Sequence, residues 1–203
     1  MADDDPIILQ GLSMILSARD GIDLVGTAGN GAEAVELSRT LLPDVVLLDI
    51  RMPVMDGIEA AEALLREELA APLLLTTFDE PELIGRALKA SARGYILKNS
   101  PAERILSAIE TVAEGGTVFA PDVIDYIRSA IHIPAGEDAD IFKEITPREK
   151  EIVQLVAEGL SNAAIAERLY LSNGTVRNHI SAILEKTGLE HRTQIAVRYY
   201  ARG

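Results

Sequence analysis

The chain has 203 residues, of which 48% are hydrophobic, and it carries a formal net charge of −13 with no cysteine. This length allows two domains of ~100 residues, and the hydrophobic share is enough for buried cores. The lack of cysteine excludes disulfides and thiolate metal sites, and the absence of a signal peptide or of an apolar run near ~18 residues predicts a cytoplasmic protein with no membrane partner.

Helical and strand patterns alternate along the first ~115 residues. Asn30 with Glu33, and the box Ser100-Pro101-Ala102-Glu103, each mark the start of a helix. Such alternation predicts a doubly wound, parallel α/β sheet. Helices are expected at 6–18, 31–39, 58–69, 81–90, 101–115 and 121–131, and strands at 24–27, 45–49, 73–76 and 95–97.

A non-periodic acidic stretch at 134–140 is interpreted as a linker, and the pattern beyond it is entirely helical. Thr146 with Glu149 predicts a capping box, while Ser161 and Ser172 cap the next two helices. With a fourth helix expected at 193–201, the tail follows the helix-turn-helix plan. We therefore divide the chain into a domain at 1–117, a helix and linker at 118–142, and a helix-turn-helix domain at 143–203.

Charge is distributed unevenly along the chain. Residues 1–142 contain 10 Lys+Arg against 25 Asp+Glu, a net charge of −15, whereas residues 143–203 contain 9 against 7, a net charge of +2. An acidic domain joined to a mildly basic one is typical of a DNA-binding module tethered to a second function. Ordinary scatter in composition is the alternative.

Polar side chains follow several apolar runs of the first domain. Asp49 closes the run at 45–48, Thr76 ends the run at 73–75, Lys98 ends the run at 95–97, and Asp3 and Asp4 precede them all. In open α/β sheets, sites lie at this carboxyl edge of the strands. A hard cation, a phosphorylatable carboxylate, a hydroxyl and an ammonium on one edge suit phosphoryl transfer onto aspartate. Taken alone, each of these residues could be a solvated surface residue, a strand residue or a turn residue. Their common position after apolar runs favours a functional site.

Several segments of the chain resemble known domains. The segments Ala2-Asp3-Asp4-Asp5-Pro6, Leu75-Thr76-Thr77-Phe78 and Gly94-Tyr95-Ile96-Leu97-Lys98, with the run that ends at Asp49, resemble the receiver domain of two-component response regulators. The tail segments Thr146-Pro147-Arg148-Glu149-Lys150-Glu151 and Gly174-Thr175-Val176-Arg177-Asn178-His179 resemble the LuxR-type helix-turn-helix domain. The chain thus resembles the NarL/LuxR class of response regulators, which implies a flavodoxin-like receiver followed by a small all-α helix-turn-helix domain.

The resemblance implies a role for the polar residues that follow the strands. Asp49 is the expected phosphoacceptor and attacks a phosphoryl donor in line. Lys98 and Thr76 are expected to bind phosphoryl oxygens. Thr76 and Tyr95 are the expected switch pair, because movement of the threonine toward the phosphoryl group leaves space for the aromatic ring.

Mg²⁺ is the expected cofactor of this pocket. Asp4 and Asp49 are expected to ligate it directly, with Asp3 acting through water. The family also implies a ligand in the backbone carbonyl of Arg51. A solvated N-terminal acidic cluster is the alternative for Asp3 and Asp4.

The predicted helix at 173–186 is amphipathic, with an apolar face made of Val176, Ile180, Ile183 and Leu184. Asn178 lies opposite that face, and Asn178 and Arg177 are expected to contact DNA bases, with Ser181 in a secondary role. Thr175 and Lys186 are expected to hold phosphates, which position a protein on DNA without specifying sequence. Plain solvation of the polar face is the alternative.

The leading hypothesis is a regulator, not an enzyme, whose promoter binding is switched when a sensor histidine kinase phosphorylates Asp49 and a homodimer forms. A haloacid-dehalogenase-type phosphatase is one alternative, but it needs a second Asp two residues after the nucleophile, where Arg51 stands. A quorum-sensing regulator is another, but its signal domain should be rich in Trp and Tyr, whereas Trp is absent and the aromatic share is 4%. The third is a degenerate receiver in a constitutive, phosphorylation-independent dimer.

The N-terminal segment departs from the receiver pattern. Only Met1 and Ala2 precede Asp3, although the family has an apolar central strand at this place. Loss of roughly three or four buried side chains at ~1.5–3 kcal/mol each is comparable with a domain's stability of ~5–15 kcal/mol. We therefore expect residues upstream of Met1, and expect that about six more there would stabilise the chain. The family also implies that the unphosphorylated receiver covers the recognition helix.

Overall fold

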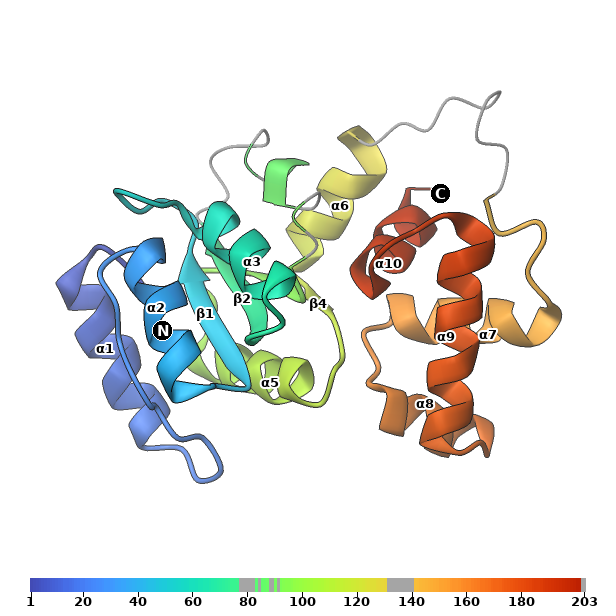
Figure 1. The fold of residues 1–203 in the computed structure, drawn as a ribbon, viewed down its shortest axis with the longest axis horizontal. Helices are drawn as coiled ribbons and strands as arrows, with labels where there is room; N and C mark the ends of the chain where they lie inside the picture. Colours follow the sequence, from blue (N-terminus) through green and yellow to red (C-terminus); the bar gives the residue numbers. More distant parts are fainter. Residues whose placement is uncertain (77–82, 84, 88–89, 91, 131–140, 202–203) are drawn as a thin grey trace.

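The structure is a computed structural model that describes residues 1–76, 83, 85–87, 90, 92–130 and 141–201. Within these ranges the N-terminal part carries a parallel sheet flanked by helices, and the C-terminal part is entirely helical (Figure 1). None of the helices in the described ranges combines the length and the apolar character that a membrane crossing requires. The N-terminal helices are α1 (Pro6–Ser17), α2 (Gly31–Leu41), α3 (Gly57–Arg66), α5 (Ala102–Ala113) and α6 (Pro121–Ala130).

A sheet of four parallel strands, in the order β1-β2-β3-β4, forms the centre of the N-terminal part. Asp49 at the end of β1 stands opposite Leu75, and Thr76 at the end of β2 stands opposite Leu97. The common direction of the strands therefore brings the polar residues that end them to one edge. This confirms the predicted fold class. The sequence did not predict β4, because a strand of two residues is too short to show a strand pattern. The strands are β1 (Val45–Asp49), β2 (Ala71–Thr76), β3 (Gly94–Leu97) and β4 (Val118–Phe119).

The residues before α1 form a stub of strand beside β1. Ala2 forms isolated parallel bridges on both sides, to Ala28 and to β1. Its amide donates to the Leu47 carbonyl at 2.8 Å, and its carbonyl accepts from the Asp49 amide at 2.9 Å. The strand predicted at 24–27 is wrong: in the described residues this segment is not a strand, and Ala28, which follows it, forms an isolated bridge to Ala2.

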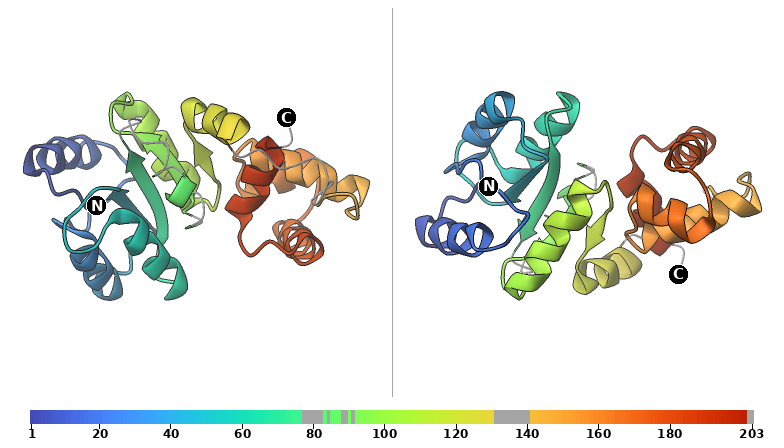
Figure 2. Two further views of the ribbon diagram at one scale, coloured as in Figure 1. Left: turned by 90° about the horizontal axis from the view of Figure 1, so that it is seen from above. Right: turned by 90° about the horizontal axis from the view of Figure 1, so that it is seen from below.

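Helices cover both faces of the sheet (Figure 2). One face carries α2 and α3, and the other carries α5. Leu48 and Leu74 belong to the apolar cluster on the α2 and α3 side, whereas Leu47 and Leu75 belong to the cluster on the α5 side. Successive residues of β1 and β2 therefore point to opposite faces, and both faces are apolar, as a buried parallel sheet requires.

Most of the predicted helix starts are confirmed. Side chains at four of them accept a backbone amide of the first helical turn, namely those of Asn30, Thr146, Ser161 and Ser172. The capping box predicted at 100–103 is wrong, because α5 begins after Pro101 without a side-chain cap. The Ser100 amide instead donates to the Leu97 carbonyl at 3.0 Å, in the turn after β3.

Two predicted elements fall partly or wholly outside the described residues. Of the helix predicted at 81–90, Leu83 and residues 85–87 are helical. The linker predicted at 134–140 lies outside the described ranges.

The C-terminal part is a bundle of short helices around one apolar core. The core includes Ile152, Ile165, Val176, Ile183 and Ile195, so that each helix contributes to it. A three-residue turn joins the second and third helices, which gives the predicted helix-turn-helix arrangement. The helices are α7 (Pro147–Ala157), α8 (Asn162–Leu169), α9 (Asn173–Thr187) and α10 (Arg192–Tyr200).

Hydrogen bonds to main-chain carbonyls join the two parts. The Thr117 amide donates to the Gly159 carbonyl and the Thr117 hydroxyl to the Val156 carbonyl, each at 3.2 Å. The Thr193 hydroxyl donates to the Ala92 carbonyl at 3.0 Å. These contacts place α10 beside α6, as Figures 1 and 2 show.

Candidate functional site

Two buried carboxylates share one lysine at the carboxyl edge of the sheet. The Lys98 ammonium lies 2.8 Å from Asp3 Oδ2 and 2.9 Å from Asp49 Oδ1. Asp3 is 1% exposed and Asp49 is 5% exposed. The stub, the end of β1 and the turn after β3 supply these residues, so the parallel sheet brings together side chains that are far apart in the sequence.

A close backbone approach fixes the loop that follows Asp49. The Gly57 amide donates to the Ile50 carbonyl at 2.9 Å. A Cβ atom at Gly57 would lie 2.0 Å from the Asp49 carbonyl oxygen, which no side chain permits. Glycine at this position therefore allows α3 to start directly beneath the carboxylate-bearing end of β1.

Burial and the lysine act in opposite directions on Asp49. Desolvation raises the pKa of Asp49, and this effect exceeds the lowering by Lys98 and by a backbone hydrogen bond from Arg51. For Lys98, desolvation would lower the pKa, but the interactions with the carboxylates of Asp3 and Asp49 outweigh it and the pKa is raised. Perturbed ionisation of this kind is common at functional sites.

The three aspartates are arranged so that they could hold a metal ion. Ligand oxygens of Asp3, Asp4 and Asp49 all lie within 4.8 Å of one another. Asp3 Oδ2 is within ion-pair distance of Lys98, yet it accepts no well-aligned hydrogen bond from the described part of the chain. This buried oxygen therefore retains capacity for a cation, and the all-oxygen set fits Mg²⁺, which keeps several waters. The role of the Arg51 carbonyl stays a prediction.

The two predicted switch residues lie on neighbouring strands. Thr76 is buried at the end of β2, and its carbonyl accepts from the Lys98 amide at 2.9 Å. Tyr95 is buried, its hydroxyl donates to the Ala87 carbonyl, and its ring stacks on Phe119 with centroids 5.6 Å apart. The structure therefore shows the inward position of Tyr95, while movement of the pair stays a prediction.

The predicted recognition helix presents its polar face to solvent. Val176, Ile180 and Ile183 of α9 are buried in the core. Arg177, Asn178 and Ser181 are exposed, and Thr175 is half-buried beside the Ser172 cap, with the two hydroxyls 2.8 Å apart. Because the three exposed side chains remain uncovered with the receiver in place, this structure contradicts the expectation that the receiver covers the recognition helix.

Lys186 differs from the other predicted DNA contacts. Its ammonium lies 2.8 Å from both carboxylate oxygens of Glu149, which is buried in the capping box of α7. The structure therefore gives Lys186 a role inside the domain, and its expected phosphate contact stays a prediction. The sequence carried no signal for this pair, since the residues lie in different helices.

Tyr170 was missed by the sequence reasoning. It occupies the turn between α8 and α9, adopts φ 55 and is 96% exposed. An aromatic residue placed directly before a predicted recognition helix could have drawn attention to it. Its exposed phenolic hydroxyl is available to a group outside the domain.

Together the aspartate pocket and the helix-turn-helix define a two-domain protein of the response-regulator class. Residues 1–110 match the family described as "Response regulator receiver domain", and residues 143–199 match "Bacterial regulatory proteins, luxR family". The chain belongs to the NarL/LuxR family of DNA-binding response regulators.

Curated relatives and solved structures agree with this assignment. The chain is 38% identical to the transcriptional regulatory protein LnrK of Bacillus subtilis, over 97% of this chain and 93% of that protein. It is 36% identical to DesR of the same organism, over 100% and 96%. The crystal structure of the response regulator ChrA, from a heme-sensing two-component system, is 33% identical with a TM-score of 0.57 and covers 99% of this chain and 94% of that one.

Proposed function

We propose that this chain is a phosphorylation-switched transcription regulator, not an enzyme, with Asp49 as phosphoacceptor and promoter DNA as ligand. The observation that carries the proposal is the shared contact of Lys98 with Asp3 and Asp49, at 2.8 and 2.9 Å, on the same sheet edge as Thr76. Structural ion pairs are common on protein surfaces, but here two buried carboxylates converge on one cation.

The chemistry is transfer of a phosphoryl group from a phosphohistidine of a sensor kinase. A carboxylate oxygen of Asp49 attacks phosphorus, so that a phosphorus–oxygen bond forms, the phosphorus–nitrogen bond breaks, and the imidazole leaves with the electron pair. The Lys98 ammonium offsets charge on one phosphoryl oxygen, and the Thr76 hydroxyl donates to another.

Asp3, Asp4 and Asp49 would hold Mg²⁺ in this pocket, because their oxygens converge within 4.8 Å. Bound there, the ion would offset charge on the transferring oxygens. Asp4 is the exposed member of the set and would be the first carboxylate to meet an entering cation.

The phosphorylated form is proposed to bind promoters as a homodimer in the cytoplasm. The tail carries a net charge of only +2, so one module makes few phosphate contacts and binds weakly. Two linked modules on two half-sites gain affinity through effective concentration. Because the polar face of α9 is already exposed, dimer formation and not uncovering would supply the switch.

A phosphorylation-independent dimer with a degenerate receiver is the competing proposal. Its main support was the short N-terminal segment before Asp3. The backbone bonds of Ala2 to β1 hold Asp3 beside Asp49, which supports the phosphorylated form instead.

Intact-mass measurement tests the proposal. With Mg²⁺ and acetyl phosphate, the chain should gain one phosphoryl group, and the Asp49→Ala variant should gain none. Asp44→Ala is the matched control, since Asp44 is exposed before β1 and should leave uptake unchanged. Genome-wide mapping of bound DNA, with and without phosphorylation, then tests the switch. Equal uptake by the Asp49→Ala variant, or identical DNA occupancy in both states, would contradict the proposal.

A further inference from the structure

The junction between the two domains buries positive charge. Arg192, the first residue of α10, is 6% exposed. Its guanidinium donates to the Asn162 side-chain oxygen and to the Leu160 carbonyl, whereas its Nε has no hydrogen-bond partner among the described residues. Arginine keeps its proton at neutral pH even when it is buried, so α10 begins with a desolvated cation.

A second arginine approaches this cation from the receiver. The Thr193 hydroxyl donates to the Ala92 carbonyl at 3.0 Å, so the residues next to them in the sequence, Arg192 and Arg93, lie on opposite sides of one contact. Arg93 is half-buried. Burial lowers the pKa of both guanidinium groups, and the charge of Arg93 adds to this effect on Arg192, whose pKa falls to about 10. The two charges therefore act on each other through protein, where screening is weaker than in water.

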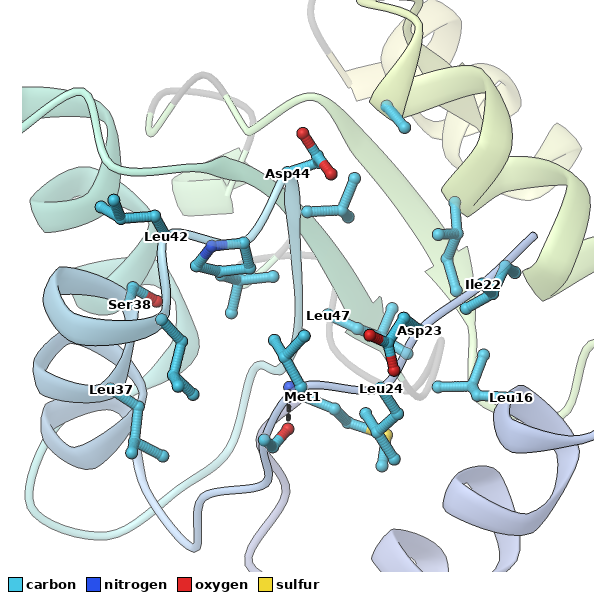
Figure 3. Close-up of a pocket in the computed structure, with 18 of the residues that line it drawn as sticks. Met1, Leu16, Ile22, Asp23, Leu24, Leu37, Ser38, Leu42, Asp44 and Leu47 are labelled. Carbon is cyan, nitrogen blue, oxygen red and sulfur yellow. Dashed lines mark hydrogen bonds between the residues drawn. The ribbon is translucent and has the colours of Figure 1, made fainter.

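No carboxylate compensates these two charges in the described part of the chain. Burial and the neighbouring arginine account for the lowered pKa values, and neither guanidinium is held in an ion pair there. The cavity of about 530 Å³ beside the amino end of β1 is lined by residues such as Leu16, Leu24 and Leu47 and by none of the junction residues, so it brings no solvent to the arginines (Figure 3). Buried charges are normally paired, because their desolvation is costly. Docking of the domains therefore has an unfavourable electrostatic contribution.

The contacts that favour docking are modest. The Thr117 amide and hydroxyl donate to the carbonyls of Gly159 and Val156, each at 3.2 Å, and Val197 and Tyr200 of α10 pack against the apolar cluster of the receiver. Each hydrogen bond gains little, since its groups bond to water when the domains separate. A balance of such small contributions can be shifted by one charge.

We propose that the charge of Arg93 opposes that of Arg192 across the domain junction, so that the receiver and the helix-turn-helix domain dock reversibly. Because the docked form leaves the polar face of α9 exposed, this charge pair governs the orientation of the helix-turn-helix domain and not access to α9. Reversible docking lets two such modules adopt the separation that a two-half-site operator sets. This consequence for DNA rests on the proposed function, whereas the effect of the charge on docking does not.

Single-molecule fluorescence energy transfer measures docking on the full chain, without a phosphodonor or DNA. The chain has no cysteine, so Glu62→Cys in α3 and Ala163→Cys in α8, both at exposed positions, accept the two dyes. A docked and a separated population are expected. Arg93→Gln removes the charge and should raise the ratio of docked to separated chains roughly three- to tenfold. Arg93→Glu places a carboxylate near Arg192 and should raise this ratio further.

Two control variants separate the effect of the charge from other causes. Arg93→Lys keeps the charge and should dock as the parent chain does. Arg104→Gln, at an exposed position on α5, removes one positive charge from the receiver away from the junction and should leave the ratio unchanged. If the parent is docked throughout, the Thr193→Val background, which lacks the hydroxyl that donates to Ala92, should show the separated population.

Three outcomes would overturn the proposal. The first is the absence of a separated population in both the parent and the Thr193→Val chain. The second is an equal ratio of docked to separated chains for Arg93→Gln and Arg104→Gln. The third is an Arg93→Lys chain that docks like Arg93→Gln, because the size of the side chain and not its charge would then set the docking.

Discussion

The ammonium of Lys186 lies 2.8 Å from both carboxylate oxygens of Glu149, and so ties the end of α9 to the start of α7. Glu149 is 3% exposed and also accepts from the Thr146 amide at 2.6 Å in the capping box. One carboxylate therefore joins a helix start to the helix that is proposed to read DNA. The expected phosphate contact of Lys186 stays a prediction beside this structural role.

Lys186→Ala should destabilise the C-terminal domain. Removal of the lysine leaves a buried carboxylate without its cation, and the partial exposure of Lys186 reduces the cost to about 1–3 kcal/mol. Chemical denaturation followed by circular dichroism measures this change. Lys150→Ala is the matched control, because Lys150 is exposed on α7, and Lys186→Arg should restore most of the loss. Equal stability of the Lys186→Ala and Lys150→Ala variants would refute the structural role.

The same pair should make the domain sensitive to acid. Desolvation tends to raise the pKa of Glu149, but hydrogen bonds from Lys186 and Thr146 outweigh it, so the pKa is lowered. A lowered carboxyl pKa contributes stability that is present above the unfolded value of about 4.3 and is lost as pH falls through the folded value. Unfolding free energy measured between about pH 6 and 3 should therefore fall more steeply for the parent chain than for Glu149→Gln.

Asp49→Asn should stabilise the receiver at neutral pH in buffer without divalent cations. The raised pKa of Asp49 means that the folded chain binds the proton more tightly than the unfolded chain. Stability then falls as pH rises from the unfolded value of about 3.9 through the folded value, and the cost is fully present above it. A gain of about 1 kcal/mol at pH 7, which disappears near pH 3, is expected.

Denaturant titrations at both pH values measure this effect. Asp4→Asn serves as the control, because Asp4 is exposed and should change stability little. Added Mg²⁺ should stabilise the parent chain more than the Asp49→Asn variant. If the variant is less stable than the parent at pH 7, the ion pair between Lys98 and Asp49 stabilises the fold by more than burial of the Asp49 carboxylate destabilises it.

Gly57→Ala should damage both stability and phosphoryl uptake. The added Cβ would lie 2.0 Å from the Asp49 carbonyl oxygen and 2.8 Å from its carbon, so the backbone of the phosphoacceptor must move. A loss of about 1–3 kcal/mol is expected from such overpacking. Gly11→Ala in α1 meets nothing within 4 Å and should be neutral or stabilising. Thermal midpoints and mass-based phosphorylation rates distinguish the two variants, and equal behaviour would contradict the role of Gly57.

Asn178→Ala should weaken binding to the preferred site by about 1–3 kcal/mol and relax discrimination at one base pair. Asn178 is exposed on the polar face of α9, and its amide matches the donor and acceptor of adenine. The helix should be retained, since Ala is the best helix former. Titrations on matched and mismatched DNA at several salt concentrations measure the effect. Equal loss on every sequence would identify a phosphate contact instead.

The sequence predicted the sheet and the aspartate pocket because their signals are local. Each buried strand is an apolar run, and each polar site residue follows such a run, so Asp49, Thr76 and Lys98 could be assigned to one edge. The polar face of α9 was likewise readable from helical spacing.

Features that depend on tertiary neighbours were not predictable. The segment at 24–27 carries a strand pattern but forms no strand, because a strand needs a partner along its length. Ser100 matches a capping pattern, but its amide is held in the turn after β3. The Glu149–Lys186 pair and the Thr117 contacts join residues from separate elements, for which one sequence contains no pairing information.

In two hydrogen bonds between the two domains, the donors are specific side chains, whereas the acceptors are main-chain carbonyls. The donors are the hydroxyls of Thr117 and Thr193, one from each domain. The acceptors are the main-chain carbonyls of Val156 and Ala92, which every amino acid possesses. Gly159 is limited by room, since a Cβ there would lie 2.4 Å from the Thr117 oxygen, and by its φ of 89°, which favours glycine. Saturation mutagenesis of this junction should therefore show that Thr117, Thr193 and Gly159 tolerate few substitutions. The acceptor positions should accept any residue that the packing allows. Substitution of a single threonine can consequently weaken the contact between the domains, and no matching substitution in the other domain is needed.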